Sequence, residues 1–338
     1  MLRKPWKDFT NLTSQSFVTD LVPAAKNVAP EDLCDMAEYR KAERMSSCGG
    51  HDPIRTLVAY AQNELIYDET DRIIPVEFAV YATIPRQRRV NKFGLSYRRD
   101  AKLWLHKTLA DIVVGAAVHL HQTQSWTTTL YDGLRTIDGA YKLYLHAHDS
   151  DMESRLLSLP GQSAHNKGMA VDSMMSDAMG REIDMGGHFD HLDMSTNGRT
   201  YGGDNISDLA KKCRLIREAA FLRSAFLQGL LIAPLRNEFW DDRLPENRED
   251  LWRVLDSAAR SIGLTLLSPE DEKLRRENRK AFCEKWERWS YADFLARWAE
   301  TFRGHESALE KMLGVTSPPL KEKPEFYHGN YNPIYDSS

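Results

Sequence analysis

The stretch that decides the fold of this chain reads, from residue 163 to residue 172, Ser-Ala-His-Asn-Lys-Gly-Met-Ala-Val-Asp. Its end opens a run from Met169 to Met175 that is partly polar on one face, which predicts a strand. Gly168 lets the backbone bend just before this strand. The strand carries Asp172, and a carboxylate in a core strand costs on the order of several kcal/mol unless a cation or metal compensates it. The stretch therefore predicts a core strand that holds a cation beside it.

His165 and Asp172 are also the nitrogen and oxygen ligands that Zn2+ accepts. The pair alone leaves open a second interpretation, in which a loop histidine lies near a salt-bridged aspartate. Other residues must therefore decide between a metal site and a structural pair.

Upstream of this stretch, the pattern predicts a helix from 101 to about 124, where apolar residues recur at helical spacing. The β-branched and aromatic run 127–131 predicts a strand, and Asp132-Gly133 a turn after it. A short helix is expected over 136–146. Residues 1–50 are mixed in character and rich in turn formers, which predicts a loosely structured lead-in.

Downstream, 206–230 predicts a long amphipathic helix and 231–235 a short strand. After Pro245 the pattern is helical only, with Ser268 and Ser290 as expected N-caps. Short strands separated by irregular loops favour the α+β class over a doubly wound parallel sheet. The helix after Ser290 is expected to carry an apolar face of Phe294, Leu295, Trp298 and Phe302. The C-terminal tryptophans are expected to pack in a core, although they could instead narrow a cleft or form a subunit interface: Trp252, Trp286, Trp289 and Trp298.

Composition excludes several classes of protein. The 338 residues are 42% apolar, enough to bury at least one full core. The 45 Lys+Arg against 49 Asp+Glu, a net charge of −4, argue against a nucleic-acid surface. No stretch approaches the ~20 apolar residues of a transmembrane helix, and no apolar run follows the basic start, so no secretory signal is expected. The four cysteines are widely spaced, which predicts neither a cysteine metal site nor a disulfide framework and favours a cytoplasmic location. The alternative is a mature form whose secretory signal was removed.

Two further segments carry residues suited to chemistry. Arg135 follows the predicted strand and turn, where a guanidinium could bind a substrate carboxylate or stabilise an oxyanion; pairing with Asp132 or Asp138 is the alternative. Residues 237–243 place three carboxylates beside two aromatic side chains, enough for a metal ligand and a general base. Such a segment is, taken alone, more often a solvated acidic turn.

The order of these segments resembles the zinc peptidase family of D-Ala-D-Ala dipeptidases and D,D-carboxypeptidases. That family carries a Ser-x-His-x-x-Gly-x-Ala-x-Asp motif, which residues 163–172 match at every fixed position. The family also has a Tyr/Trp-Asp-Gly turn with an arginine, like 131–135, and a Met-Gly-x-x-Phe-Asp segment, like 185–190. A long helix and a glutamate with a tryptophan follow, as in 206–230 and 238–240. The resemblance covers about residues 70–245.

The resemblance implies a role for each matching residue. His165 and Asp172 would bind one Zn2+ per chain, Glu238 would be the acid/base, and Arg135 would polarise the scissile carbonyl. The expected substrate-binding residues are Asp190, which would meet a free amino group, Ser163 and Trp240. The implied fold is a small central antiparallel sheet with flanking helices and the metal on its face.

One position departs from the family: Asp241 stands where the last zinc ligand is a histidine. Aspartate also binds zinc, so Asp241 is the favoured third ligand, in a harder site that would also accept Mn2+. Asp242, His188 or His191 could complete the site instead, or the site is degenerate.

We therefore expect a zinc metallopeptidase that cuts D-Ala-D-Ala or short peptidoglycan stem peptides by metal-activated water, as a dipeptidase or as a D,D- or L,D-carboxypeptidase. The alternative is a non-catalytic module, binding a peptide or a partner on a degenerate peptidase scaffold. The expected domains are an N-terminal extension (1–70), the peptidase domain (71–245), a helical extension (246–315) and a tail (316–338). The expected partner is a small peptide containing D-amino acids, and no nucleic acid.

Overall fold

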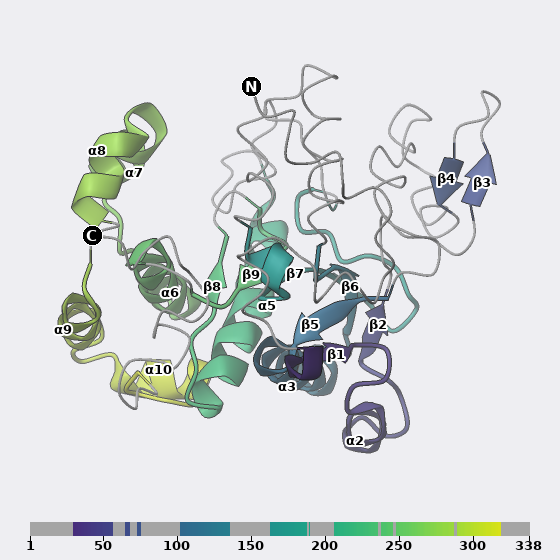
Figure 1. Ribbon diagram of the computed structural model, residues 1–338. Helices are drawn as coiled ribbons and strands as arrows, with labels where there is room; N and C mark the ends of the chain where they lie inside the picture. The colour runs from purple at the N-terminus through teal and green to yellow at the C-terminus, as the bar shows by residue number, and fades with distance from the viewer. Residues whose placement is uncertain are drawn as a thin grey trace. The chain divides into compact units, whose positions relative to one another are not determined.

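The computed structural model of the protein describes residues 30–56, 65–67, 73–75, 102–135, 163–187, 189, 206–235, 238–245, 248–286 and 289–318. Helices and short strands make up these ranges, and the predicted α+β class is confirmed (Figure 1). None of the described helices has the length and apolarity that crossing a bilayer requires. The helix expected over 136–146 lies outside the described residues.

The largest sheet has five strands in the order β2-β6-β7-β9-β8. These strands are β2 (Ile54–Thr56), β6 (Thr127–Asp132), β7 (Ala170–Ser176), β9 (Asp241–Arg243) and β8 (Ala233–Pro234). The strands predicted over 127–131 and 169–175 are confirmed as β6 and β7. Every residue of β7 is buried, so this strand runs through a core and exposes neither face. β8 and β9 are antiparallel, with Ala233 opposite Arg243.

Two smaller sheets consist of antiparallel pairs. β1 (Leu33–Asp35) pairs with β5 (Trp104–His106), and β3 (Leu65–Tyr67) pairs with β4 (Ile73–Pro75). The described part of the expected lead-in is therefore ordered, which corrects that prediction for residues 30–50. Strand β1 is followed by α2 (Lys41–Ser47) after a short turn. Pairing with β5 and burial of Leu33 and Met36 stabilise this segment. Neither contact can be recognised from the sequence pattern of the segment itself.

The chain divides into two compact units. The first comprises 1–43, 54–110 and 129–173, and the second comprises 44–53, 111–128 and 174–338. The division runs through helix α3 (Lys107–Gln124) and through strands β6 and β7. Because the pieces of each unit are far apart in sequence, the fold depends on long-range contacts. The domain limits expected from the sequence stay predictions.

Helix α3 begins six residues later than its sequence pattern predicts, because residues 104–106 are taken by strand β5. Helix α5 (Asp208–Leu227) is shorter than the predicted 206–230 at both ends. At its start, the Ser207 hydroxyl accepts a hydrogen bond from the Ala210 N–H at 3.1 Å. Such a cap satisfies one of the N–H groups that a helix start leaves without a partner.

From Arg248 onward the described chain is helical, as expected. The described helices in this part are α6 (Arg248–Ser261), α7 (Pro269–Glu277), α8 (Arg279–Trp286), α9 (Tyr291–Thr301) and α10 (Glu306–Leu313). Both predicted caps are confirmed, since Ser268 and Ser290 each form a capping box.

The aromatic side chains of these helices pack in a core, as predicted. Trp252 meets Phe282 edge-to-face with ring centroids 5.3 Å apart, and Trp298 meets Phe226 of α5 at 5.4 Å. Leu295 is the exception to the predicted apolar face, because 38% of its surface is exposed. These helices therefore form one packed body with α5.

A largely buried cluster of ionisable side chains joins α5 to α6. Oε1 of Glu218 accepts hydrogen bonds from the Ser257 hydroxyl and from Nη2 of Arg260, the latter at 3.0 Å. Arg260 also donates through Nε to Asp256 at 3.1 Å. Burial raises the pKa of Glu218 to about 8, although Arg260 and the Ser257 hydroxyl act to lower it. Glu218 therefore keeps its proton near neutral pH in the folded protein.

This raised pKa predicts a pH-dependent stability. Between about 4.5 and about 8 the unfolded chain has lost the Glu218 proton while the folded chain retains it, so stability falls as pH rises. Glu218→Gln has no proton to lose at this position. Its free energy of unfolding should therefore fall less steeply with pH than that of the parent, and the two slopes should differ by up to about 1.4 kcal/mol per pH unit. Urea unfolding over a pH series measures the slope. The control is Glu300→Gln, an exposed residue of α9, and an unchanged slope in Glu218→Gln would contradict the prediction.

Candidate metal centre

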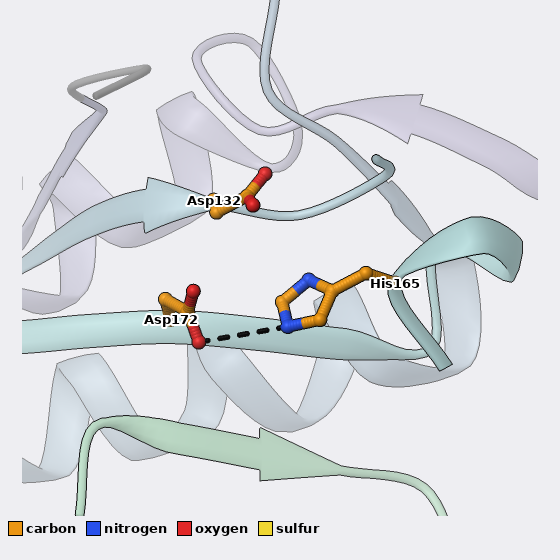
Figure 2. Close-up of side chains that lie close together, drawn as sticks. All are labelled: Asp132, His165 and Asp172. Carbon is orange, nitrogen blue, oxygen red and sulfur yellow. Dashed lines mark ion pairs between the residues drawn. The ribbon is translucent and has the colours of Figure 1, made fainter. Parts of the chain in front are cut away.

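Three buried side chains that can bind a metal gather in the first unit (Figure 2). Asp132 ends β6, His165 lies in the short helical turn η7 (Ala164–Lys167), and Asp172 lies in β7. One possible ligand atom from each residue lies within 4.8 Å of the others. Asp172 is only 3% exposed. The group could hold a metal ion.

The turn that carries His165 is built by its neighbours in the sequence. The Ser163 hydroxyl accepts a hydrogen bond from the His165 N–H at 3.2 Å, and the Asn166 side chain accepts one from the Ser163 N–H at 3.2 Å. The Asn166 amide also donates to the Arg135 carbonyl at 2.8 Å. These bonds give Ser163 a structural role, while its predicted substrate contact stays a prediction.

Gly168 ends the turn and could not be replaced without strain. Its φ is +67°, a conformation that side chains with a Cβ rarely adopt. A Cβ there would lie 3.0 Å from the backbone nitrogen of His106, whose N–H donates to the Gly168 carbonyl at 2.8 Å. The expected bend between His165 and the strand is thus also a point of close backbone approach.

The hydrogen bond made by one ring nitrogen of His165 orients the other. Nδ1 lies 2.9 Å from the Gly133 carbonyl oxygen, which can only accept, so Nδ1 carries a hydrogen. Nε2 then faces Oδ1 of Asp172 at 3.6 Å, the dashed contact in Figure 2. A carbonyl partner on the second nitrogen is the usual arrangement of a histidine that binds a metal.

The separation of these two atoms also suits a shared metal. At 3.6 Å it exceeds the length of an N–H···O hydrogen bond. Two ligands bound at 2.0–2.2 Å to a tetrahedral Zn2+ lie about 3.4 Å apart. Without a metal, the same geometry would be an ion pair between a protonated ring and the carboxylate. The donor set and its spacing therefore fit a metal ion.

Arg135 bridges the two carboxylates of the cluster. Its Nε and Nη2 donate to Oδ2 of Asp132 at 2.9 and 2.6 Å, and Nη2 lies 3.9 Å from Oδ2 of Asp172. Oδ1 of Asp132 accepts from the Gly133 N–H at 2.8 Å. The pairing with Asp132 that the sequence left open is present, but it is largely buried. The guanidinium offsets part of the negative charge and is held in one orientation.

Asp132 was not predicted as a metal ligand. Its sequence signal was its place at the end of a strand, directly before a glycine turn. Because β6 and β7 are neighbours in the sheet, the end of β6 can lie beside Asp172 of β7. Neighbouring strands cannot be identified from the sequence pattern of either one.

The other predicted residues belong to the second unit. Asp241 opens β9 and forms an ion pair with Arg243, and Asp242 accepts a hydrogen bond from Arg217. Trp240 is buried between Phe189 and Phe239, with ring centroids 5.9 and 4.9 Å away. Among the described residues, the third member of the metal-binding group is Asp132 and not Asp241. The roles expected for Asp241, Trp240 and Glu238 stay predictions.

Three further candidates, Asp190, His188 and His191, lie outside the described residues. Their neighbour Phe189 is buried and packs on Trp240. Two segments that the family resemblance links, 185–190 and 238–240, therefore meet through aromatic side chains within the second unit.

Comparisons of the chain with protein-family models and with curated proteins gave no match.

Metal binding by this cluster can be measured directly. We expect the parent protein to bind Zn2+ in calorimetry and to unfold at a higher temperature when Zn2+ is present, because a ligand that binds only the folded state stabilises it. Asp172→Asn should lower the affinity by more than about 100-fold, since even residues that only orient a ligand contribute 10–100-fold. Asp177→Asn changes a more exposed carboxylate just beyond the same strand and is the control. Equal Zn2+ affinity in Asp172→Asn and the parent would exclude this site.

Proposed function

We propose that the protein is a zinc metallopeptidase. The observation that carries this proposal is the buried cluster in which His165 Nε2, with its other nitrogen hydrogen-bonded to a carbonyl, faces Asp172 at 3.6 Å beside Arg135. His165, Asp172 and Asp132 would hold the ion. A bound Zn2+ supplies Lewis-acid chemistry and lowers the pKa of water to near neutral.

Arg135 would stabilise the negative charge that develops on the scissile carbonyl oxygen. Its two bonds to Asp132 fix the guanidinium before substrate arrives, and a charge that needs no reorientation stabilises a transition state most effectively. The fixed guanidinium also limits repulsion between Asp132 and Asp172. Arg135 would thus serve both the structure of the site and the reaction.

Glu238 would act as the general base and then as the general acid. In peptide hydrolysis such a carboxylate takes a proton from the attacking water and returns it to the leaving amine. This assignment follows from the resemblance of residues 163–172 and 238–240 to the peptidase family. The same resemblance supports D-Ala-D-Ala or a short stem peptide as the substrate, with Asp190 binding a free amino group.

The role of Glu238 gives a sharp test. Zinc-loaded protein is incubated with D-Ala-D-Ala, a stem tetrapeptide and a stem pentapeptide, and products are detected by mass spectrometry. Glu238→Ala should lower turnover by about 100-fold or more, the range typical of a general base, while the protein still binds Zn2+. The control is Glu310→Ala on α10, which should retain full turnover. Cleavage by Glu238→Ala at the parent rate would remove Glu238 from the mechanism.

The third ligand can be assigned by comparing two carboxylates. Asp132 belongs to the cluster, whereas Asp241 is neutralised by Arg243. We expect Asp132→Asn to weaken Zn2+ binding by more than about tenfold and Asp241→Asn to weaken it less. Calorimetry on both variants and the parent provides the comparison. The opposite order would assign the third ligand to Asp241, as the family resemblance implies.

A second candidate function is a non-catalytic module that binds a peptide or a partner. The Asp241–Arg243 ion pair favours it, because Asp241 stands where the family has a histidine ligand and its charge is already compensated. This candidate predicts protein that lacks stoichiometric metal and cuts none of the three peptides. Activity created by Asp241→His would also support it.

A further inference from the structure

Glu238 lies in a loop between two short strands of the second unit, and Asp241 opens the second of these strands. β8 and β9 pair antiparallel, with Pro234 opposite Asp242. The Leu235 N–H donates to the Asp241 carbonyl at 2.8 Å, the Glu238 N–H to the Leu235 carbonyl at 3.1 Å, and the Asp241 N–H to the Glu238 carbonyl at 3.0 Å. We call residues 235–240 the β8–β9 loop, of which the structure describes 235 and 238–240. Backbone hydrogen bonds close this loop, and between Glu238 and Asp241 it carries the aromatic pair at 239–240.

Arg217 of helix α5 holds this loop from the protein interior. The side chain is only 1% exposed. Its guanidinium donates to three acceptors that lie within four residues of one another in the chain. These are the carbonyl oxygen of Phe239 at 3.0 Å, the carbonyl oxygen of Trp240 at 2.8 Å and Oδ2 of Asp242 at 2.5 Å. The same group packs over the Phe221 ring at 4.9 Å. One side chain thus holds two consecutive peptide groups, the one that joins Phe239 to Trp240 and the one that joins Trp240 to Asp241.

A second arginine of α5 holds the loop from one turn earlier. Arg214 lies over the Phe239 ring at 3.8 Å, and its Nε donates to the Met185 carbonyl at 2.5 Å. Residues three apart share one face of a helix, so both guanidinium groups reach the same segment. Burial and the neighbouring charge of Arg217 lower the pKa of Arg214 to about 10. Two like charges side by side in a core are costly unless acceptors compensate them, and here the carbonyl groups of Met185, Phe239 and Trp240 and the carboxylate of Asp242 do so.

The chemistry of the contact requires a guanidinium. Only a planar group with several donors in a fixed fork can bind two carbonyl oxygens and a carboxylate together. A lysine offers a single ammonium centre and cannot reproduce this arrangement. Asp242 is the charge partner of Arg217. In this acidic segment Asp242 therefore anchors the loop from β9, and Glu238 lies within the loop.

We propose that Arg217 is a positioning residue, which through Phe239, Trp240 and Asp242 fixes the β8–β9 loop and so sets the positions of Glu238 and Asp241. This inference rests on the proposed function in assigning chemistry to the loop. The hold of Arg217 on the loop itself does not depend on that function.

The test measures loop order and catalysis separately in Arg217→Lys. Hydrogen exchange of the metal-free protein should become faster in peptides covering 235–242 by about tenfold or more, the factor expected for loss of a hydrogen bond to a charged group. Peptides from α9 and α10 should exchange as in the parent. For the peptide that the parent cuts, kcat should fall by about 100-fold with little change in KM, as expected when a reacting group is misplaced.

Two variants make the result specific. Arg260→Lys alters an arginine of the same unit that is less buried and does not contact the loop in any described hydrogen bond, and it should leave exchange at 235–242 and kcat unchanged. Should Arg217→Lys fail to fold, Arg217→Met/Asp242→Leu removes both buried charges together and avoids an uncompensated charge. This double variant should fold and show the same fast exchange in the loop.

The outcomes separate the inference from the proposed function. Unchanged exchange at 235–242 in a folded Arg217 variant overturns the inference, whatever the activity. Fast exchange in the loop with normal kcat also overturns it, because Arg217 would then order the loop without positioning Glu238. Fast exchange in a protein whose parent cuts no peptide leaves Arg217 as the anchor of the loop and rejects the peptidase.

Discussion

The carboxylate of Asp172 is the constraint on which the first unit depends. It lies in a strand that is buried along its whole length, where an uncompensated charge would cost several kcal/mol by order of magnitude. The surrounding structure supplies the compensation: His165 is directed at it from a rigid turn, and Arg135 lies within ion-pair distance. The glycine at 168, the cap at Ser163 and the bend of the chain all serve to bring that imidazole to the strand.

In the second unit, arginine side chains bind carboxyl groups that are buried in the core. Arg217 forms a buried ion pair with Asp242, and Arg260 donates a hydrogen bond to Glu218; each contact joins elements that are distant in sequence. Breaking one partner of a buried pair is far more costly than losing a surface pair, so such contacts specify one arrangement of helices and loops. The C-terminal helices pack on α5, and α5 also carries Arg217, which holds the loop that contains Glu238.

The fold and the candidate site were predictable from the sequence to different degrees. Strands β6 and β7 and the caps at Ser268 and Ser290 were correctly predicted because each depends on residues next to one another in the chain. The start of α3 was misplaced because strand pairing with β1, a contact across about 70 residues, outweighed helical periodicity. Residues 30–50 were expected to be loosely structured, and they are ordered for the same reason, because β1 pairs with the distant strand β5.

By itself, the sequence determined the α+β class, through short strands separated by irregular loops, and the buried strand with its acid, through the residues of 163–175. The motif at 163–172 also proposed His165 and Asp172 as partners, because the two residues lie only seven positions apart. Only the tertiary structure decided that Asp132 joins this pair, that Arg135 bridges two carboxylates, and that Arg217 holds the β8–β9 loop. The physical reason is the same in each case. A side chain's partner in a core is chosen by which strands and helices become neighbours, and that choice depends on contacts summed over the whole chain.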